Sequence, residues 1–222
     1  TSSGGTAGVA NGFATITSGA VSTNYGSLTT VRSGRFIFAH PHKFRSIVRI
    51  TNFSIADSVR RWGAFTVTGT PPTTVDGYYF EFSATNVLSV NTRNNGGTVV
   101  SVSSGSFNGS TPFYEVDQNA HAYEIVFFLG KAQFWVDGML LHTFIPTTTL
   151  MTQSCTLPIT ASAIKSATST GSAGMEVWAA VILRHGRDIT APKSTYYSAA
   201  TANTPVKIGP GRLLRVIVGN WI

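Results

Sequence analysis

Charge, cysteine and long apolar runs are all scarce in this sequence. Only 11% of its 222 residues are charged, which is less than half of the share in an ordinary globular domain. The single cysteine, Cys155, excludes a disulfide within the chain and a cysteine-rich zinc site. Because a secreted β-domain of this size often carries a disulfide, we expect assembly in a cytoplasm. The sequence has no apolar run of about 18 residues, so we predict no contact with a membrane.

The basic excess is small in absolute terms. Sixteen Lys and Arg residues against nine Asp and Glu residues give a net charge of +7. The basic residues are scattered rather than gathered into the run that a nucleic-acid-binding arm would require. We therefore predict no direct contact with nucleic acid. Two interpretations stay open: a minor imbalance among few charges, or contact with an acidic surface such as another subunit or an anionic polysaccharide.

Strand-forming residues dominate the composition. Hydrophobic residues make up 42% of the chain and aromatic residues 11%, whereas the residues that build long helices are used sparingly. This composition excludes a helical bundle, a coiled coil and a doubly wound nucleotide-binding enzyme, and it argues against disorder. From residue 31 onward, turn signals recur at intervals of about 8 to 12 residues, which predicts an all-β, antiparallel β-sandwich.

Local patterns predict particular strands. Residues 44–50 alternate between apolar and polar, so every second side chain of this strand should face the core. The Asp137-Gly138 pair predicts a type I′ turn inside a unit of three antiparallel strands over residues 122–145. We also expect strands over residues 35–39, on both sides of the turn at 94–97, and over residues 174–184. Residues 147–170 are expected to form a Ser/Thr-rich loop that holds residues 157–159.

The chain divides into three predicted parts. Residues 1–30 contain no charged residue and form either a free linker or an extended N-terminal arm that docks as a strand on a neighbouring subunit. Residues 31–190 form the sandwich. Residues 191–222 form a linker and a C-terminal strand that opens a second small β-domain, because a lone turn and strand cannot bury themselves. The apolar residues of the arm are its expected contacts: Val9, Phe13, Ile16, Val21 and Tyr25.

Two segments resemble known families. Residues 123–127, followed by Phe134-Trp135-Val136-Asp137-Gly138, resemble the hairpin of concanavalin A-like β-sandwiches, the jelly-roll fold of lectins, laminin G domains and glucanases. This resemblance covers about residues 31–190 and says little about function. Residues 206–216 resemble the opening of a small β-domain that is frequent in structural proteins of tailed bacteriophages. Together with the uncharged arm, this second resemblance implies a virion protein.

Catalysis and metal binding are not predicted. Glucanases of the concanavalin A-like fold carry paired acidic residues on one strand, and Glu115 and Asp117 stand two positions apart in this chain. Asn119 follows them, so we interpret the pair as a solvated loop end and predict no enzyme activity. His40 and His42 have no nearby carboxylate that would complete a metal site. The aspartates expected in turns form no calcium-binding cluster, so we expect neither a metal nor a cofactor.

Sugar binding would require an exposed aromatic ring beside polar side chains. Neighbouring positions of a strand point to opposite faces, so one residue of each aromatic pair in the predicted strands should point outward. The candidates for a carbohydrate-binding surface are Trp62, Tyr78, Tyr79 and Trp135.

These patterns together predict a structural component of a bacteriophage virion. It would decorate or cement the capsid, as a capsid decoration protein or head fibre, or form part of a tail fibre. We expect a homo-oligomer, with a trimer as the guess, in contact with other virion proteins such as the major capsid protein. Its location would be the virion, after assembly in the host cytoplasm. The alternative is a lectin-like, carbohydrate-binding module that recognises host surface glycans.

Overall fold

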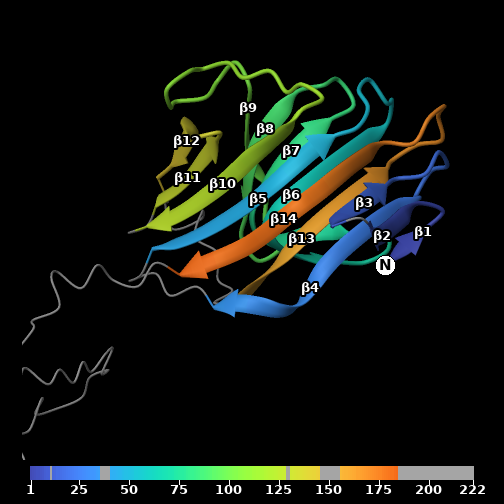
Figure 1. Ribbon diagram of the computed structural model, residues 1–222, viewed down its shortest axis with the longest axis horizontal. Helices are drawn as coiled ribbons and strands as arrows, with labels where there is room; N and C mark the ends of the chain where they lie inside the picture. The colour runs from blue at the N-terminus through green and yellow to red at the C-terminus, as the bar shows by residue number, and fades with distance from the viewer. Residues whose placement is uncertain (11, 36–40, 129–130, 146–155, 185–222) are drawn as a thin grey trace, which may run out of the picture. The chain divides into compact units, whose positions relative to one another are not determined.

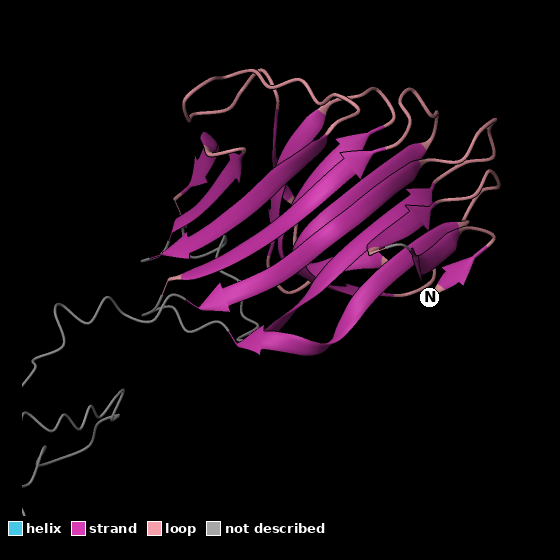
Figure 2. Cartoon of the chain, viewed as in Figure 1, coloured by secondary structure: helices cyan, strands magenta, loops and turns pink. Residues whose placement is uncertain are grey.

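The β-branched and aromatic residues form strands throughout the part of the chain that the structure describes. The structure is a computed structural model, and it describes residues 1–10, 12–35, 41–128, 131–145 and 156–184. Figure 2 shows these residues as strands joined by loops and turns. The described chain contains no apolar helix of membrane-spanning length.

Two antiparallel sheets of seven strands stack face to face (Figure 1). Sheet 1 has the order β1 (Ser2–Ser3), β4 (Tyr25–Arg35), β13 (Thr156–Lys165), β6 (Ser58–Thr68), β7 (Thr73–Ser83), β8 (Leu88–Arg93) and β9 (Val100–Ser103). Sheet 2 has the order β12 (Met139–Phe144), β11 (Lys131–Val136), β10 (Ala120–Phe128), β5 (His42–Ile50), β14 (Gly174–Arg184), β3 (Phe13–Thr17) and β2 (Thr6–Ala10). The predicted antiparallel sandwich is confirmed.

Aromatic side chains join the two sheets in the core. The Trp62 ring of β6 stacks on Phe80 of β7 at 5.8 Å between centroids, and it meets Tyr123 of β10 edge-on at 4.9 Å. Phe80 also meets Phe134 of β11 at 5.1 Å. Edge-to-face pairs of this kind add to the stabilisation from burial. The inward faces of both sheets are thereby fixed, and the opposite faces point away from the core.

Two local predictions are confirmed. In β5 the inward residues Phe44 and Val48 are buried, while Arg45 points outward and is exposed. Residues Asp137 and Gly138 have φ values of 49° and 81°, as a type I′ turn requires, and they join β11 to β12. Both patterns depend on residues that are close in the sequence.

Strand β13 corrects the loop that was predicted over residues 147–170. Residues Thr156–Lys165 pair with β4 on one side and with β6 on the other. The small residues Ala161 and Ala163 are buried toward the core, and Thr160 and Ser162 alternate with them. Hydrogen bonds to two neighbouring strands hold this segment in place, although its small side chains carry little strand propensity of their own.

The N-terminal segment also differs from the prediction. β2 and β3 form a hairpin that extends sheet 2 at β14, and β1 pairs with β4 in sheet 1. β4 crosses the predicted boundary at residue 30, and the compact unit spans Thr1–Arg187. Instead of an arm for a neighbouring subunit, the described strands within residues 1–30 belong to the chain's own sandwich, because its open sheet edges are the nearest partners for their backbone groups.

The predicted arm contacts are therefore divided between core and surface. Ile16 and Tyr25 are buried within this chain, Phe13 is half-buried, and Val9 and Val21 are exposed. Other predictions lie outside the described residues: the strand after Arg35, Cys155, His40 and the C-terminal segment 191–222.

Candidate functional site

Trp178 lies on the outer face of sheet 2, at the point where the pairing of β14 changes. The register between β14 and β5 shifts between Val177 and Ala179, which marks a β-bulge. On the other side of β14, the pairing with β3 ends at Val177, opposite Ala14. The Trp178 side chain is 47% exposed. A bulge of this kind re-aims a side chain at the edge of a sheet, and here it leaves a large aromatic ring open to solvent.

The ring of Trp178 contacts Phe13 and Glu176, and Arg49 binds the same Glu176 carboxylate. Phe13 of β3 stacks against it at 5.9 Å between centroids, with 23° between the ring planes. The indole Nε1–H donates to Oε2 of Glu176 at 3.1 Å. Arg49 of β5 donates from Nη2 to Oε1 of the same carboxylate at 2.8 Å. We call Phe13, Arg49, Glu176 and Trp178 the Trp178 cluster; it offers an exposed aromatic surface beside a positioned guanidinium.

Glu176 is the centre of this cluster. Burial raises the pKa of its carboxyl, but the hydrogen bonds from Arg49 and Trp178 lower that pKa by more, and the net direction is down. Glu176 therefore stays ionised at neutral pH and accepts hydrogen bonds from both partners. The ring and the guanidinium are thus oriented before any ligand arrives, which reduces the cost of binding.

The charged residues of the same face continue from the Trp178 cluster across sheet 2. Glu124 of β10 receives Lys43 Nζ at 2.6 Å and Arg45 Nε at 3.4 Å, both from β5. Glu176 pairs in register with Arg49, and Glu124 pairs with Arg45. These residues alternate with the buried positions of their strands, so they share the outer face of sheet 2.

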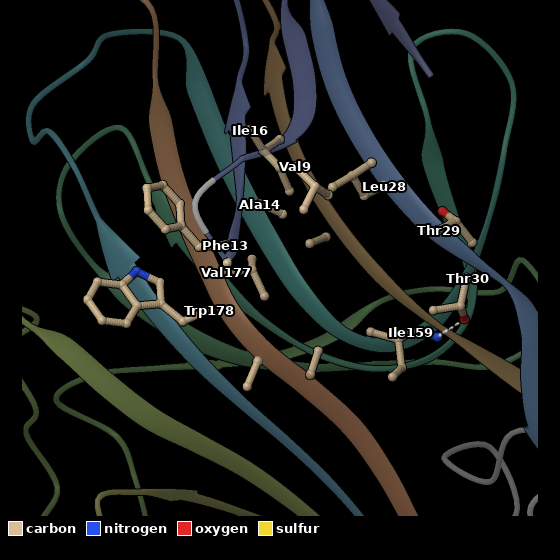
Figure 3. Close-up of a pocket in the computed structure, with 14 residues that line it drawn as sticks. Val9, Phe13, Ala14, Ile16, Leu28, Thr29, Thr30, Ile159, Val177 and Trp178 are labelled. Carbon is tan, nitrogen blue, oxygen red and sulfur yellow. Dashed lines mark hydrogen bonds between the residues drawn. The ribbon is translucent and has the colours of Figure 1, made fainter.

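A groove beside β14 includes Phe13 and Trp178 of the Trp178 cluster in its lining. Its volume is about 290 Å³, and apolar residues such as Val9, Leu28 and Ile159 line it. In Figure 3 the rings of Phe13 and Trp178 lie on one side of β14, and Leu28 and Ile159 lie on the other. The hydroxyl of Thr30 in this groove already accepts from the Ile159 N–H at 3.0 Å and donates to the Arg32 carbonyl. Few polar groups therefore remain in the groove to form hydrogen bonds with a hydroxyl-rich ligand.

Three of the predicted sugar-binding residues are not exposed. Trp62 and Tyr79 are each 1% exposed, and Tyr78 is buried against Phe127 at 4.6 Å between ring centroids. Trp62 and Tyr78 face the core between the sheets, and Tyr79 packs against Phe65 on the opposite side of sheet 1. The exposure expected for these rings is therefore wrong, because contacts within the chain cover them.

The fourth candidate, Trp135, lies on the outer face of sheet 2. It alternates with the buried residues Phe134 and Val136 of β11, is half-buried, and pairs in register with Glu124. The structure thus brings Trp135 and Phe13, a residue of the predicted arm, onto one face.

Trp178 and Glu176 were not among the predicted site residues. Both lie in a strand that the sequence predicts, but no local signal shows that β3 leaves Trp178 uncovered.

The acidic pair considered for catalysis lies in a loop between β9 and β10. Glu115 and Asp117 are exposed. Asp117 accepts from Nε2 of His121 at 2.8 Å and from the backbone N–H of Asn119 at 2.6 Å. The hydrogen bond from His121 is the main cause that lowers the pKa of Asp117 to about 2. A carboxyl group with so low a pKa is not protonated near neutral pH, so Asp117 does not suit the role of a general acid.

Metal ligands do not gather in the described part of the chain. No group of three or more His, Cys, Asp or Glu residues there is arranged to hold a metal ion. His42 is buried in β5. Asp117 and Asp137 both contact His121, with Asp137 Oδ2 at 2.5 Å from His121 Nδ1, so their carboxylates hold an imidazole ring.

The comparisons with known proteins identify the fold. No protein-family model matches this sequence, and no curated protein matches it. Among solved structures, the chain is similar to the carbohydrate-recognition domain of Emp47p, with a TM-score of 0.59, 14% identity, and coverage of 82% of this chain and 86% of that one. It is also similar to the carbohydrate-binding module CBM66 from Bacillus subtilis, with a TM-score of 0.51, 9% identity, and coverage of 82% and 93%.

An enzyme shares the same fold. The Bacillus licheniformis β-glucanase has a TM-score of 0.51 and 15% identity, with coverage of 80% of each chain. Identities this low show the fold alone. The chain therefore has the concanavalin A-like jelly-roll architecture, which includes both binding domains and hydrolases. Its function has to be argued from the site.

Proposed function

We propose that this protein is a carbohydrate-binding module and that the Trp178 cluster is its binding site. The observation that carries the proposal is the exposed indole ring, which Phe13 and Glu176 hold in one orientation. A sugar ring presents C–H groups on its faces and hydroxyl groups around its edge. The faces pack on an aromatic ring, while the hydroxyls accept from a guanidinium and donate to a carboxylate.

The similar structures support carbohydrate binding, but they do not distinguish a binding domain from a hydrolase. A carbohydrate-recognition domain, a carbohydrate-binding module and a β-glucanase all have this fold. The site supports binding, because Glu176 is committed to Arg49 and Trp178, and Asp117 is committed to His121. Carboxylates that are held in this way orient other groups. The proposal is therefore recognition of a glycan without its cleavage.

The test is a glycan-binding assay with the Trp178→Ala variant. We expect the variant to bind at least about tenfold more weakly, as for an aromatic residue at the centre of an interface, since tenfold corresponds to about 1.4 kcal/mol. Phe113→Ala is the matched control, because Phe113 is also an exposed aromatic residue but lies in the loop between β9 and β10. Equal binding by Trp178→Ala and the native chain, or no glycan binding at all, would contradict the proposal.

Subunit contact is a second candidate, and exposed apolar residues favour it. Val181 and Leu183 of β14 are exposed, and among the described residues this part of β14 pairs with β5 on one side only. An open edge with apolar side chains is a template for pairing with another copy. Val181→Lys should then lower the mass measured by light scattering from that of an oligomer to that of a monomer. A native chain that is already monomeric would contradict this second candidate.

The virion role itself remains a prediction from the sequence, and no observation on the described residues supports it.

A further inference from the structure

The cations on the outer face of sheet 2 form a row beside the Trp178 cluster. Lys43, Arg45 and Arg49 occupy outward positions of β5, the strand next to β14. Outward positions on a strand recur about every 7 Å, and neighbouring strands are about 4.8 Å apart. A glycan that rests on Trp178 therefore lies within reach of this row.

The acidic residues of this face lie beneath its basic residues. The side chain of Arg45 is 52% exposed and that of its partner Glu124 is 16% exposed. Arg49 is 41% exposed and its partner Glu176 is 11% exposed. A guanidinium has five N–H donors, so a contact through one nitrogen leaves others for a ligand. The carboxylates thus position the guanidinium groups, and the layer that meets solvent is basic.

The charges of this face do not cancel. Its described strand residues include four cations, Lys43, Arg45, Arg49 and Lys131, and two carboxylates, Glu124 and Glu176. A neutral sugar gains nothing from an excess of positive charge. An acidic ligand gains both steering at long range and charge-assisted hydrogen bonds at contact.

The face is wide enough for several sugar residues. Trp135 of β11 and Trp178 of β14 lie on it with β10 and β5 between them. Three strand spacings correspond to roughly 14 Å. A ligand that contacts both indoles must cross the charged rows on β10 and β5, which favours a polymer over a single sugar.

We propose that the ligand is an acidic polysaccharide, a glycan that carries carboxylate or sulfate groups, bound across the outer face of sheet 2 by the Trp178 cluster together with Lys43 and Arg45. This inference rests on the proposed carbohydrate-binding function and names its ligand class. The aromatic ring packs on the sugar, and the basic row binds the acidic groups.

The experiment compares acidic and neutral polysaccharides as ligands of the native chain. Alginate supplies carboxylate groups, heparin supplies sulfate groups, and dextran is the neutral polymer. We expect tighter binding to one or both acidic polymers than to dextran, and weaker binding as salt is raised from 20 to 500 mM, values chosen to shorten the screening length from roughly 20 Å to about 4 Å.

Arg45→Gln tests the basic row without disturbing the fold. Arg45 is half exposed, and Glu124 keeps Lys43 as its partner in this variant. We expect roughly fivefold weaker binding to the acidic polymer. Arg32→Gln is the matched control, because Arg32 is an exposed cation of the same charge on β4 of sheet 1; its binding should equal that of the native chain.

The outcomes separate the two proposals. If dextran binds as tightly as the acidic polymers, without salt dependence and with loss in Trp178→Ala, the acidic ligand is wrong and the carbohydrate-binding function stands. If Arg45→Gln and Arg32→Gln weaken binding equally, the basic row is not the contact. If no polysaccharide binds, or duplex DNA alone binds with the same dependence on Arg45, both proposals fail.

Discussion

On sheet 1, an outward row across β13, β6, β7 and β8 contains Thr160, Tyr79 and Asn91, and all three side chains are buried. On sheet 2, outward positions carry Arg45, Arg49 and Trp178, each of which is about half exposed. Both rows alternate with core residues in the same way. The difference shows that alternation along a strand identifies which side chains point away from the core. Solvent exposure then determines which of these side chains can contact a ligand.

The largest expected effect is a difference in the free energy of unfolding between an alanine variant on the outer face of sheet 1 and one on the outer face of sheet 2. Tyr79→Ala removes a buried ring that packs against Phe65, and it should lower the free energy of unfolding by about 3–5 kcal/mol. Trp178→Ala removes an exposed ring whose main packing partner is Phe13, and it should cost about 1 kcal/mol. Urea unfolding followed by circular dichroism measures both. Equal losses would mean that Trp178 is a structural residue and that the two faces do not differ in role.

A smaller effect concerns the carboxylate that orders the exposed face. Glu176→Gln weakens the hydrogen bonds from Arg49 and Trp178 and should cost about 1–2 kcal/mol at pH 7. Because the pKa of Glu176 is lowered in the folded chain, its stabilisation is present above the ordinary value and is lost as the pH falls through the folded value.

The native chain should therefore lose more stability than Glu176→Gln between pH 7 and pH 3, as measured by unfolding at each pH. Glu115→Gln, at an exposed loop carboxylate, is the control and should follow the native chain. A native chain and a Glu176→Gln variant with the same pH profile would show that this carboxylate does not order the face.

The smallest effect lies at the end of sheet 2, where His121 bridges Asp117 and Asp137. Burial lowers the pKa of His121, but the hydrogen bonds to the two carboxylates raise it to a net value above the ordinary one. Its stabilisation is then fully present below about pH 6.5 and is lost as the pH rises through the folded value. We expect a loss below about 1 kcal/mol, because both carboxylates are exposed.

His142 provides the internal control for this prediction. Burial lowers its pKa, so its ring should titrate below the ordinary value, whereas the His121 ring should titrate above it. A proton NMR titration of the two rings in one sample measures both. If His121 titrates below His142, the two carboxylates do not hold a charged imidazole.

The parts of the fold that follow from neighbouring residues could be predicted from the sequence. The alternation of β5 and the Asp137-Gly138 turn depend on side-chain periodicity and on backbone dihedrals within a few residues. The three-strand unit from β10 to β12 follows from the same local information, because its strands are consecutive and its turns are short.

The parts that depend on distant partners could not be predicted. β13 is ordered by β4 and β6, and β3 is ordered by β14, and no local pattern identifies these partner strands. Trp178 illustrates the same limit for the site. Its exposure results from where β3 stops and where β14 bulges, and a single sequence contains neither fact in its local pattern.

The pairing of β3 with β14 has a consequence for how the protein is made. The two halves of the Trp178 cluster come from opposite ends of the described chain, with Phe13 near its start and Trp178 near its end. A ribosome releases the β2–β3 hairpin long before β14 exists, and an isolated hairpin is marginally stable in water. The hairpin therefore stays without its partner strand through most of the chain's synthesis, and the Trp178 cluster forms only after β14 has been made.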